Sequence, residues 1–107
     1  MKSYEELNSD LEKFKNNESS EYDLKPIQKW MEKELGVKRL KNPRGSKVRF
    51  EHAAFLEWND DSCFMTHVLH KGKEQIRRAN FRNYLYKDLK TIIEYMRKEG
   101  LCGDERH

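Results

Sequence analysis

The sequence predicts an α+β domain with the element order helix, helix, strand, strand, strand, helix. Two kinds of periodicity support this order: apolar residues recur at helical spacing towards both ends of the chain and alternate in its middle. Turn residues separate these segments. Three antiparallel strands packed on helices give a chain of 107 residues a way to bury one core.

The first helix is predicted over residues 3–15. Ser3 and Glu6 form the Ser-x-x-Glu capping pattern at its start, and Asn16-Asn17 ends it. The segment 16–21, NNESSE, is expected to be a linker. The apolar stripe of this helix is Tyr4, Leu7, Leu11 and Phe14.

The second helix is predicted from Asp23, its expected N-cap, to Gly36, which stops it. Pro26 lies in the first turn, where proline is tolerated. Its predicted buried stripe is Leu24, Ile27, Met31 and Leu35.

Three strands are predicted next, over 37–41, 47–58 and 63–70, with turns at 42–45 and 59–62. Alternation in the second strand predicts that Phe55 lies on its outer face, where an apolar patch would suit a protein partner or a second copy of the chain. The other face of that strand is expected to carry Val48, Phe50, Ala54, Leu56 and Trp58, and the third strand to turn Phe64 and Val68 to one face.

The last helix is predicted from residue 79 or 80 to Lys98, with Gly100 beyond its end. Its expected stripe is Phe81, Leu85, Leu89, Ile92 and Met96. The chain therefore divides into an acidic N-terminal helix with its linker (1–22), an α-β-β-β-α domain (23–99) and a flexible tail (100–107).

Charge is spread unevenly along this chain. Residues 1–24 carry three basic and seven acidic side chains, whereas residues 25–107 carry nineteen basic and twelve acidic ones. This asymmetry favours an anionic partner for the main body, with RNA as the expected one. It also raises the alternative that the acidic segment folds back over the basic surface.

Two basic clusters are the candidate contacts for such a partner. The first is the segment 38–50, KRLKNPRGSKVRF, which has six basic residues and no acidic one, and the second precedes the last helix. Cations on a tight turn or at a helix start bind phosphate well, although a solvated loop is the alternative for each. The predicted nucleic-acid-binding residues are Lys38, Arg39, Lys41, Arg44, Ser46, Arg49, Lys71, Lys73, Arg77, Arg78 and Arg82.

The order α-β-β-β-α is that of the double-stranded-RNA-binding-domain fold, and over residues 24–98 the chain resembles the HicA family of small ribonuclease toxins. One matching run is Gly45-Ser46-Lys47-Val48-Arg49-Phe50. The other contains His70, Lys73, Glu74, Ile76 and Phe81-Arg82. The resemblance implies metal-independent cleavage of mRNA and a protein antitoxin, HicB, that masks the site.

The chain departs from that family at its catalytic position, because Lys47 stands where the family has histidine. A lysine of ordinary pKa is a cation at neutral pH and a poor general base. His52, His67 and His70 are the candidate replacements, since metal-independent cleavage needs an acid, a base and a cation. The predicted catalytic set is Lys47, His67 and His70, and the alternative is that each histidine packs at the margin of the core.

No cofactor and no metal site are predicted, because the histidines lack metal-ligand spacing and Cys63 and Cys102 lie far apart. No segment reads as a signal peptide or a membrane span, so a cytoplasmic protein is expected. Two functions compete. One is a HicA-like RNA-interacting protein, either a ribonuclease or an inactive relative; the other is a phage or mobile-element module that docks on a nucleic-acid-binding protein.

Overall fold

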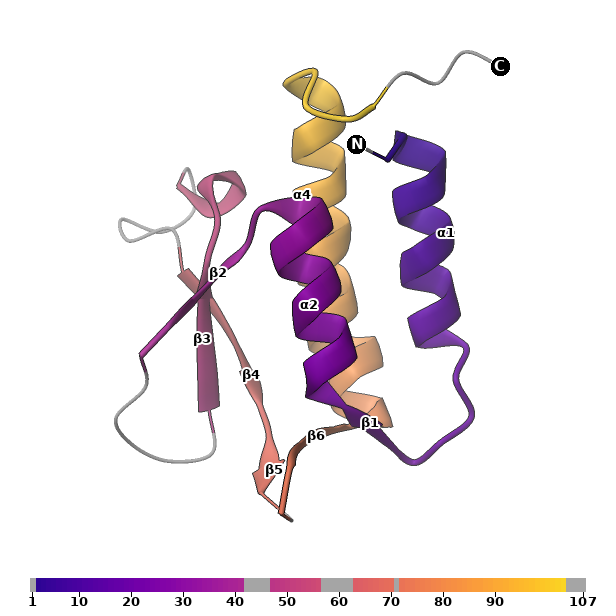
Figure 1. Ribbon diagram of the computed structural model, residues 1–107, viewed down its shortest axis with the longest axis vertical. Helices are drawn as coiled ribbons and strands as arrows, with labels where there is room; N and C mark the ends of the chain where they lie inside the picture. The colour runs from indigo at the N-terminus through magenta and orange to yellow at the C-terminus, as the bar shows by residue number, and fades with distance from the viewer. Residues whose placement is uncertain (1, 42–46, 57–62, 71, 104–107) are drawn as a thin grey trace.

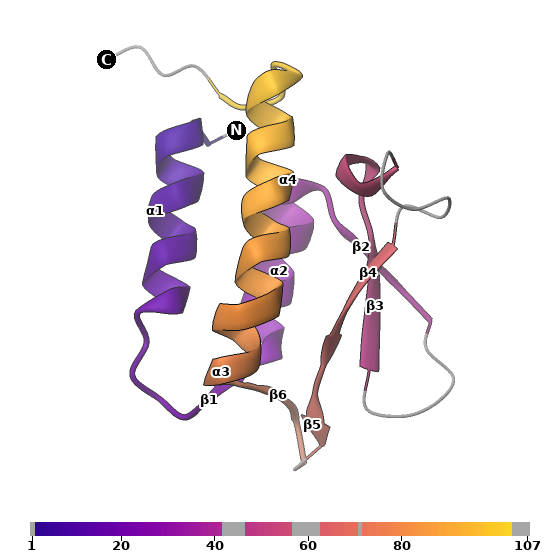
Figure 2. The same ribbon diagram turned by 180° about the vertical axis from the view of Figure 1, so that it is seen from behind.

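The computed structural model describes residues 2–41, 47–56, 63–70 and 72–103, and these ranges form an α+β fold. Helix α1 (Tyr4–Lys15), helix α2 (Leu24–Leu35) and helix α4 (Tyr86–Lys98) lie side by side, and the sheet β2–β3–β4 lies on the far side of α2 and α4 from α1 (Figures 1 and 2). No helix in these ranges has the length and apolar content needed to cross a bilayer.

The predicted three-stranded antiparallel sheet is present, with the order β2–β3–β4. It consists of β2 (Lys38–Leu40), β3 (Lys47–Glu51) and β4 (Cys63–His67). Phe50 pairs with Phe64 across β3 and β4, and both side chains are buried. One face of this sheet therefore packs on the helices, and the other carries the polar residues that alternate with these aromatic ones.

A second small antiparallel sheet, absent from the sequence-based prediction, has the order β1–β6–β5. Its strands are β1 (Glu21–Asp23), β5 (Leu69–His70) and β6 (Glu74–Arg77). The expected linker ends in β1 because Tyr22 is buried opposite Ile76 and its hydroxyl donates to the carbonyls of Lys15 and Asn17. The third predicted strand is accordingly two strands, β4 and β5, separated by the buried Val68.

The expectation that the second strand extends from Lys47 to Trp58 is wrong within the described residues. Strand β3 ends at Glu51, and a 3₁₀ turn follows over Ala53–Phe55. Because alternation stops there, Leu56 is 61% exposed instead of buried, whereas Phe55 is only 8% exposed and packs on Phe64. Trp58 lies outside the described residues.

His52 causes this change of direction. Its Nδ1 accepts a hydrogen bond from the Ala54 N–H at 3.0 Å, so its Nε2 carries the hydrogen that is donated to the Leu35 carbonyl at 2.8 Å. The ring thus caps the 3₁₀ turn and joins it to the end of α2. His52 is buried, which agrees with the alternative that this histidine packs at the margin of the core.

The helices follow the predicted stripes closely. The capping box of Ser3 and Glu6 is formed, and Gly36 ends α2 with a φ of 70°, which glycine adopts readily. Asp23 occupies the N-cap position of α2, but its carboxylate accepts hydrogen bonds from Lys73 and Gln75 instead of capping the helix. All five predicted stripe residues of the last helix are buried.

The last helix begins at Arg78 and is not uniform. A short α-helical turn, α3 (Arg78–Asn80), is followed by a π-helical segment at Phe81–Leu85 and then by α4. Wider turns of this type are uncommon and occur often at functional sites. The segment faces β4, so it shapes the surface next to the sheet.

The acidic N-terminal segment packs on the rest of the fold. Leu7 and Leu11 are buried in the same core as α4, and Lys90 of α4 donates to Asn8 at 2.7 Å. At the other end of the chain, the Gly103 N–H donates to the Lys2 carbonyl at 2.8 Å. Helix α1 thus covers the side of α4 that is remote from the sheet.

We expect His52→Ala to lower the free energy of unfolding by about 2 kcal/mol, because it leaves the Ala54 N–H and the Leu35 carbonyl without this partner. Burial lowers the pKa of His52, although its bond to the Leu35 carbonyl acts in the opposite direction. The unfolded chain therefore binds this proton first, and the wild-type protein should lose stability as the pH falls below about 6.5.

Urea unfolding at pH 7.5 and pH 5.5 checks this, with the exposed His67→Ala as the matched control. The control should unfold like the wild type at both pH values. Equal destabilisation by both variants would contradict the structural role of His52.

Candidate nucleic-acid interface

The structure separates the predicted phosphate-binding residues by what their side chains contact. Arg44, Ser46 and Lys71 lie outside the described residues. Four of the others bind within the protein: Arg39, Lys73, Arg78 and Arg82. Arg49 is half-buried, and Lys38, Lys41 and Arg77 are exposed.

Arg39 is a structural residue. Its guanidinium forms a two-point ion pair with Glu74, with Nη1–Oε1 and Nη2–Oε2 distances of 2.7 and 2.6 Å. The Glu74 carboxylate raises the pKa of Arg39 further, and Nη1 also donates to Gln28. This contact joins β2 to β6, and therefore one sheet to the other, so Arg39 is not available to a partner.

Arg78 and Arg82 are held by the N-terminal segment. Arg78 donates to the Glu18 carbonyl at 2.9 Å and lies 3.4 Å from its carboxylate, while the Arg82 Nε donates to the Lys15 carbonyl at 3.0 Å. The alternative in which the acidic segment folds back over basic residues is thus correct for these two arginines. Their cations fix the chain between α1 and β1.

Lys47 and His67 are brought together although twenty positions separate them. They are direct partners in the antiparallel register of β3 and β4, so their side chains project from the same face of the sheet. Both side chains are exposed. Lys41 follows β2 at this same end of the sheet and is also exposed, so this end carries two lysines and a histidine.

The opposite end of that face is less basic. Lys38 pairs with Glu51 in the register of β2 and β3, which places a carboxylate beside it. The described face is therefore most positive at the end that carries Lys47 and His67. His70 belongs to β5, where it pairs with Glu74, and its side chain lies outside what the structure describes.

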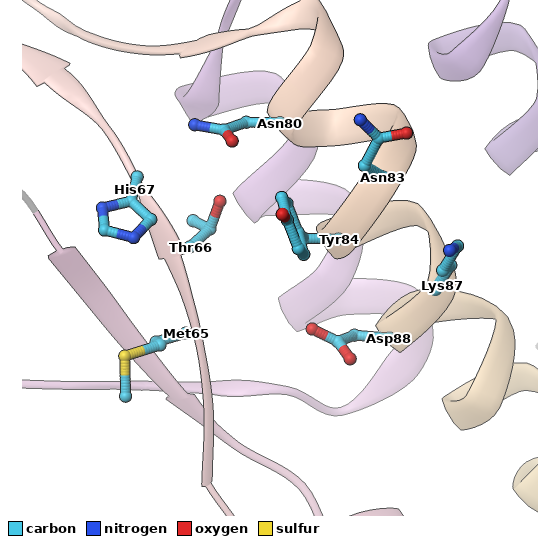
Figure 3. Close-up of a pocket in the computed structure, with 8 residues that line it drawn as sticks. All are labelled: Met65, Thr66, His67, Asn80, Asn83, Tyr84, Lys87 and Asp88. Atoms are coloured by element: carbon cyan, nitrogen blue, oxygen red, sulfur yellow. The ribbon is translucent and has the colours of Figure 1, made fainter.

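A pocket of about 540 Å³ lies beside this basic end, between β4 and the start of the last helix (Figure 3). We call it the strand–helix pocket. Its helix wall includes Asn80, Tyr84 and Asp88, which recur every four residues and therefore share one helix face. The complete lining is Met65, Thr66, His67, Asn80, Asn83, Tyr84, Lys87 and Asp88.

The side chains differ in how they meet the strand–helix pocket. Figure 3 shows the Thr66 hydroxyl, the Tyr84 ring and the Asp88 carboxylate between the strand and the helix, whereas Asn83 and Lys87 point away from the strand. Tyr84 is 62% exposed, so a large part of this side chain is accessible to a ligand. A flat aromatic wall next to hydrogen-bonding groups suits a planar polar ligand.

Asp88 is the unusual group in this pocket. Burial raises the pKa of its carboxyl group to about 6, and no hydrogen bond or ion pair to Asp88 is found within the described ranges. The carboxylate is therefore half-buried with no partner among the described residues, which costs stability. Sequence reasoning missed it, although its spacing from Asn80 and Tyr84 on one helix face was a usable signal.

A smaller hollow adjoins the strand–helix pocket and shares two lining residues with it, His67 and Asn80. Arg77 supplies a cation to this second hollow, which Val68 and Leu69 complete. We call it the Arg77 hollow. A space for a planar group thus lies next to a space that carries an arginine and an imidazole.

Metal ligation finds no support in the described ranges, which contain no group of three His, Cys, Asp or Glu side chains placed to hold an ion. The described residues of this surface present ammonium, guanidinium, imidazole, hydroxyl and carboxyl groups.

Arg39→Ala should lower the free energy of unfolding by about 1–2 kcal/mol, because it breaks a charge-assisted, partly buried contact between the two sheets. Thermal or urea unfolding measures this, with the neighbouring exposed Lys38→Ala as the control. A loss no larger than that of the control would show that the ion pair contributes nothing to the fold.

Asp88→Asn should raise the free energy of unfolding by about 1–2 kcal/mol at pH 7.5. The folded protein keeps the Asp88 proton up to a pH of about 6, whereas the unfolded chain releases it near 3.9. The protonated carboxyl group of Asp88 thus contributes most stability below about pH 4, and this contribution is lost as the pH rises towards 6. The stability gained by Asp88→Asn should therefore vanish at about pH 4.

The exposed Glu99→Gln at the end of α4 is the control for that measurement, and it should change stability by a few tenths of a kcal/mol at most. A destabilised Asp88→Asn at pH 7.5 would mean that the carboxylate has a favourable partner.

Comparison with protein-family models, with characterised proteins and with solved structures finds no match to this chain.

Proposed function

We propose that this protein binds single-stranded RNA at the end of the sheet that carries Lys41, Lys47 and His67, with a fold of the double-stranded-RNA-binding-domain type and a kinship to HicA-like toxins. The order α2–β2–β3–β4–α4 supports this fold type. The proposal rests on the register that pairs Lys47 with His67.

Phosphate recognition follows from that register. Lys47 supplies a compact cation and His67 an imidazole on the same exposed face, and neither has a hydrogen bond or ion pair with any residue the structure describes. Exposed lysines such as Lys47 contact phosphate oxygens, while arginines in internal ion pairs such as Arg39–Glu74 do not.

Preference for a single strand follows from the adjoining pocket. Sequence-specific contacts to RNA are made chiefly to unstacked bases, which stack on aromatic side chains and bond through their edges. The exposed ring of Tyr84 offers such a stacking face within a pocket that His67 also lines.

Binding is better supported than cleavage. Transfer of a proton from a 2′-hydroxyl and to the leaving oxygen requires a base and an acid, and the ammonium group of a lysine is a poor general base. Among the described side chains, this surface offers a single imidazole, that of His67. An inactive relative of the ribonuclease toxins is accordingly the form of the proposal that we favour.

Two observations weaken the protein-docking alternative, although Leu56 and Tyr84 are exposed. Phe55, expected to form an exposed apolar patch, is buried, and the apolar side of the acidic α1 packs into the core. A protein antitoxin that covers Lys47 and His67 is still the partner that the family resemblance implies.

Lys47→Ala should weaken binding of a labelled oligouridine about tenfold at low salt, and wild-type affinity should fall with a log–log salt slope of about −2, as expected for some three phosphate contacts. Fluorescence anisotropy at several salt concentrations measures both quantities. Lys13→Ala, an exposed lysine on α1, is the matched control and should bind like the wild type.

The same RNA incubated with the wild-type protein in EDTA should stay intact. Cleavage that is lost in His67→Ala would make the protein a metal-independent ribonuclease and overturn the non-catalytic form of the proposal. Weak binding at every salt concentration, unchanged by Lys47→Ala, would overturn RNA binding itself.

A further inference from the structure

We infer that the strand–helix pocket holds an unpaired guanine base of the bound RNA, with Tyr84 stacking on the base and Asp88 bonding to its Watson–Crick edge. The inference rests on the proposed RNA binding and names the nucleotide that this site selects. Three observations carry it: the composition of the pocket, the state of Asp88 and the adjoining Arg77 hollow.

The pocket has the size and the walls that a base requires. Its volume of about 540 Å³ lies within the range of small-molecule sites. Tyr84 presents an exposed ring on the helix side, and stacking of a base on an aromatic ring contributes about 1–3 kcal/mol. Stacking alone does not distinguish bases, because every base has such a face.

Asp88 supplies the discrimination. An ionised carboxylate accepts hydrogen bonds and donates none, so it prefers a base edge with two adjacent donors. The N1–H and N2–H₂ groups of guanine form such an edge. Adenine and cytosine each place a ring-nitrogen acceptor beside their amino group, and uracil flanks its one N–H with two carbonyls.

The surroundings of Asp88 make a hydrogen bond from the base to its carboxylate favourable. The carboxylate is half-buried, points into the space between β4 and the helix, and has no partner among the described residues (Figure 3). A ligand that donates two hydrogen bonds would relieve that unfavourable burial. Figure 3 also shows the Asn80 amide directed towards the strand, where it can bond to a further polar atom of the base.

The Arg77 hollow accounts for the phosphate of the same nucleotide. It shares His67 and Asn80 with the strand–helix pocket and adds the Arg77 guanidinium. A base in the pocket therefore places its sugar near these shared residues and a phosphate near Arg77. The chain then continues towards Lys47, the cross-strand partner of His67.

The test compares oligouridines of about ten nucleotides that carry one central guanosine, inosine or adenosine. Inosine keeps N1–H but lacks the N2 amino group, so it removes one of the two donors and nothing else. The guanosine oligomer should bind about tenfold tighter than the other two at one salt concentration, as measured by fluorescence anisotropy.

Two variants assign the effect to the pocket. Asp88→Asn should reduce the guanosine-to-adenosine affinity ratio to near one, and its unfolding curve at pH 7.5 shows directly that it is folded. Tyr84→Ala should weaken the guanosine oligomer about tenfold through lost stacking. Glu99→Gln is the charge-matched control and should keep the wild-type ratio.

The outcomes separate this inference from the proposed function. Equal affinity for all three oligomers, with the Lys47→Ala defect intact, would overturn the guanine site and leave RNA binding in place. A guanosine preference that survives Asp88→Asn would also overturn it. Absence of binding to every oligomer would overturn both.

Discussion

Burial of one face of the C-terminal helix is the constraint on which the rest of the structure depends. Phe81, Leu85, Leu89 and Ile92 are fully buried, and α1, α2 and the sheet all pack around this helix. Each of these elements buries part of its apolar side against that helix, because a chain of this length forms one core. The sheet is thereby held beside the π-helical turn, and this contact creates the strand–helix pocket.

Several arginines make contacts within the protein, whereas composition alone suggests that they bind an anionic partner. Arg39 joins the two sheets through Glu74, and Arg78 and Arg82 hold the N-terminal segment in place. A high count of basic residues therefore overstates the surface that is open to an anionic partner. Lys41 and Lys47 are exposed and have no ion pair with a residue that the structure describes, so position in the fold and not charge alone selects the proposed RNA contact.

Asp88 shows how stability and binding oppose each other at this site. Burial raises the pKa of its carboxyl group to about 6, so at neutral pH the folded protein carries an ionised group in an unfavourable place. Such a group does not stabilise the fold, and a bound ligand with two donors would offset its cost. The exposed Tyr84 beside Asp88 likewise does little to stabilise the fold, because an exposed aromatic surface contributes little to the core.

Local pattern determined the helices: the capping box at Ser3, the stop at Gly36 and the apolar stripes are all visible in the sequence, since each depends on neighbours within a few residues. The short strands β1 and β6 and the turn at His52 were not predictable, because each depends on hydrogen bonds to distant segments. For the same reason, the candidate site was only partly predictable from the sequence. Lys47 and His67 were recognised as candidates, but only the register of β3 and β4 paired them, and only the packing of the last helix against β4 placed Asp88 in a pocket that His67 also lines.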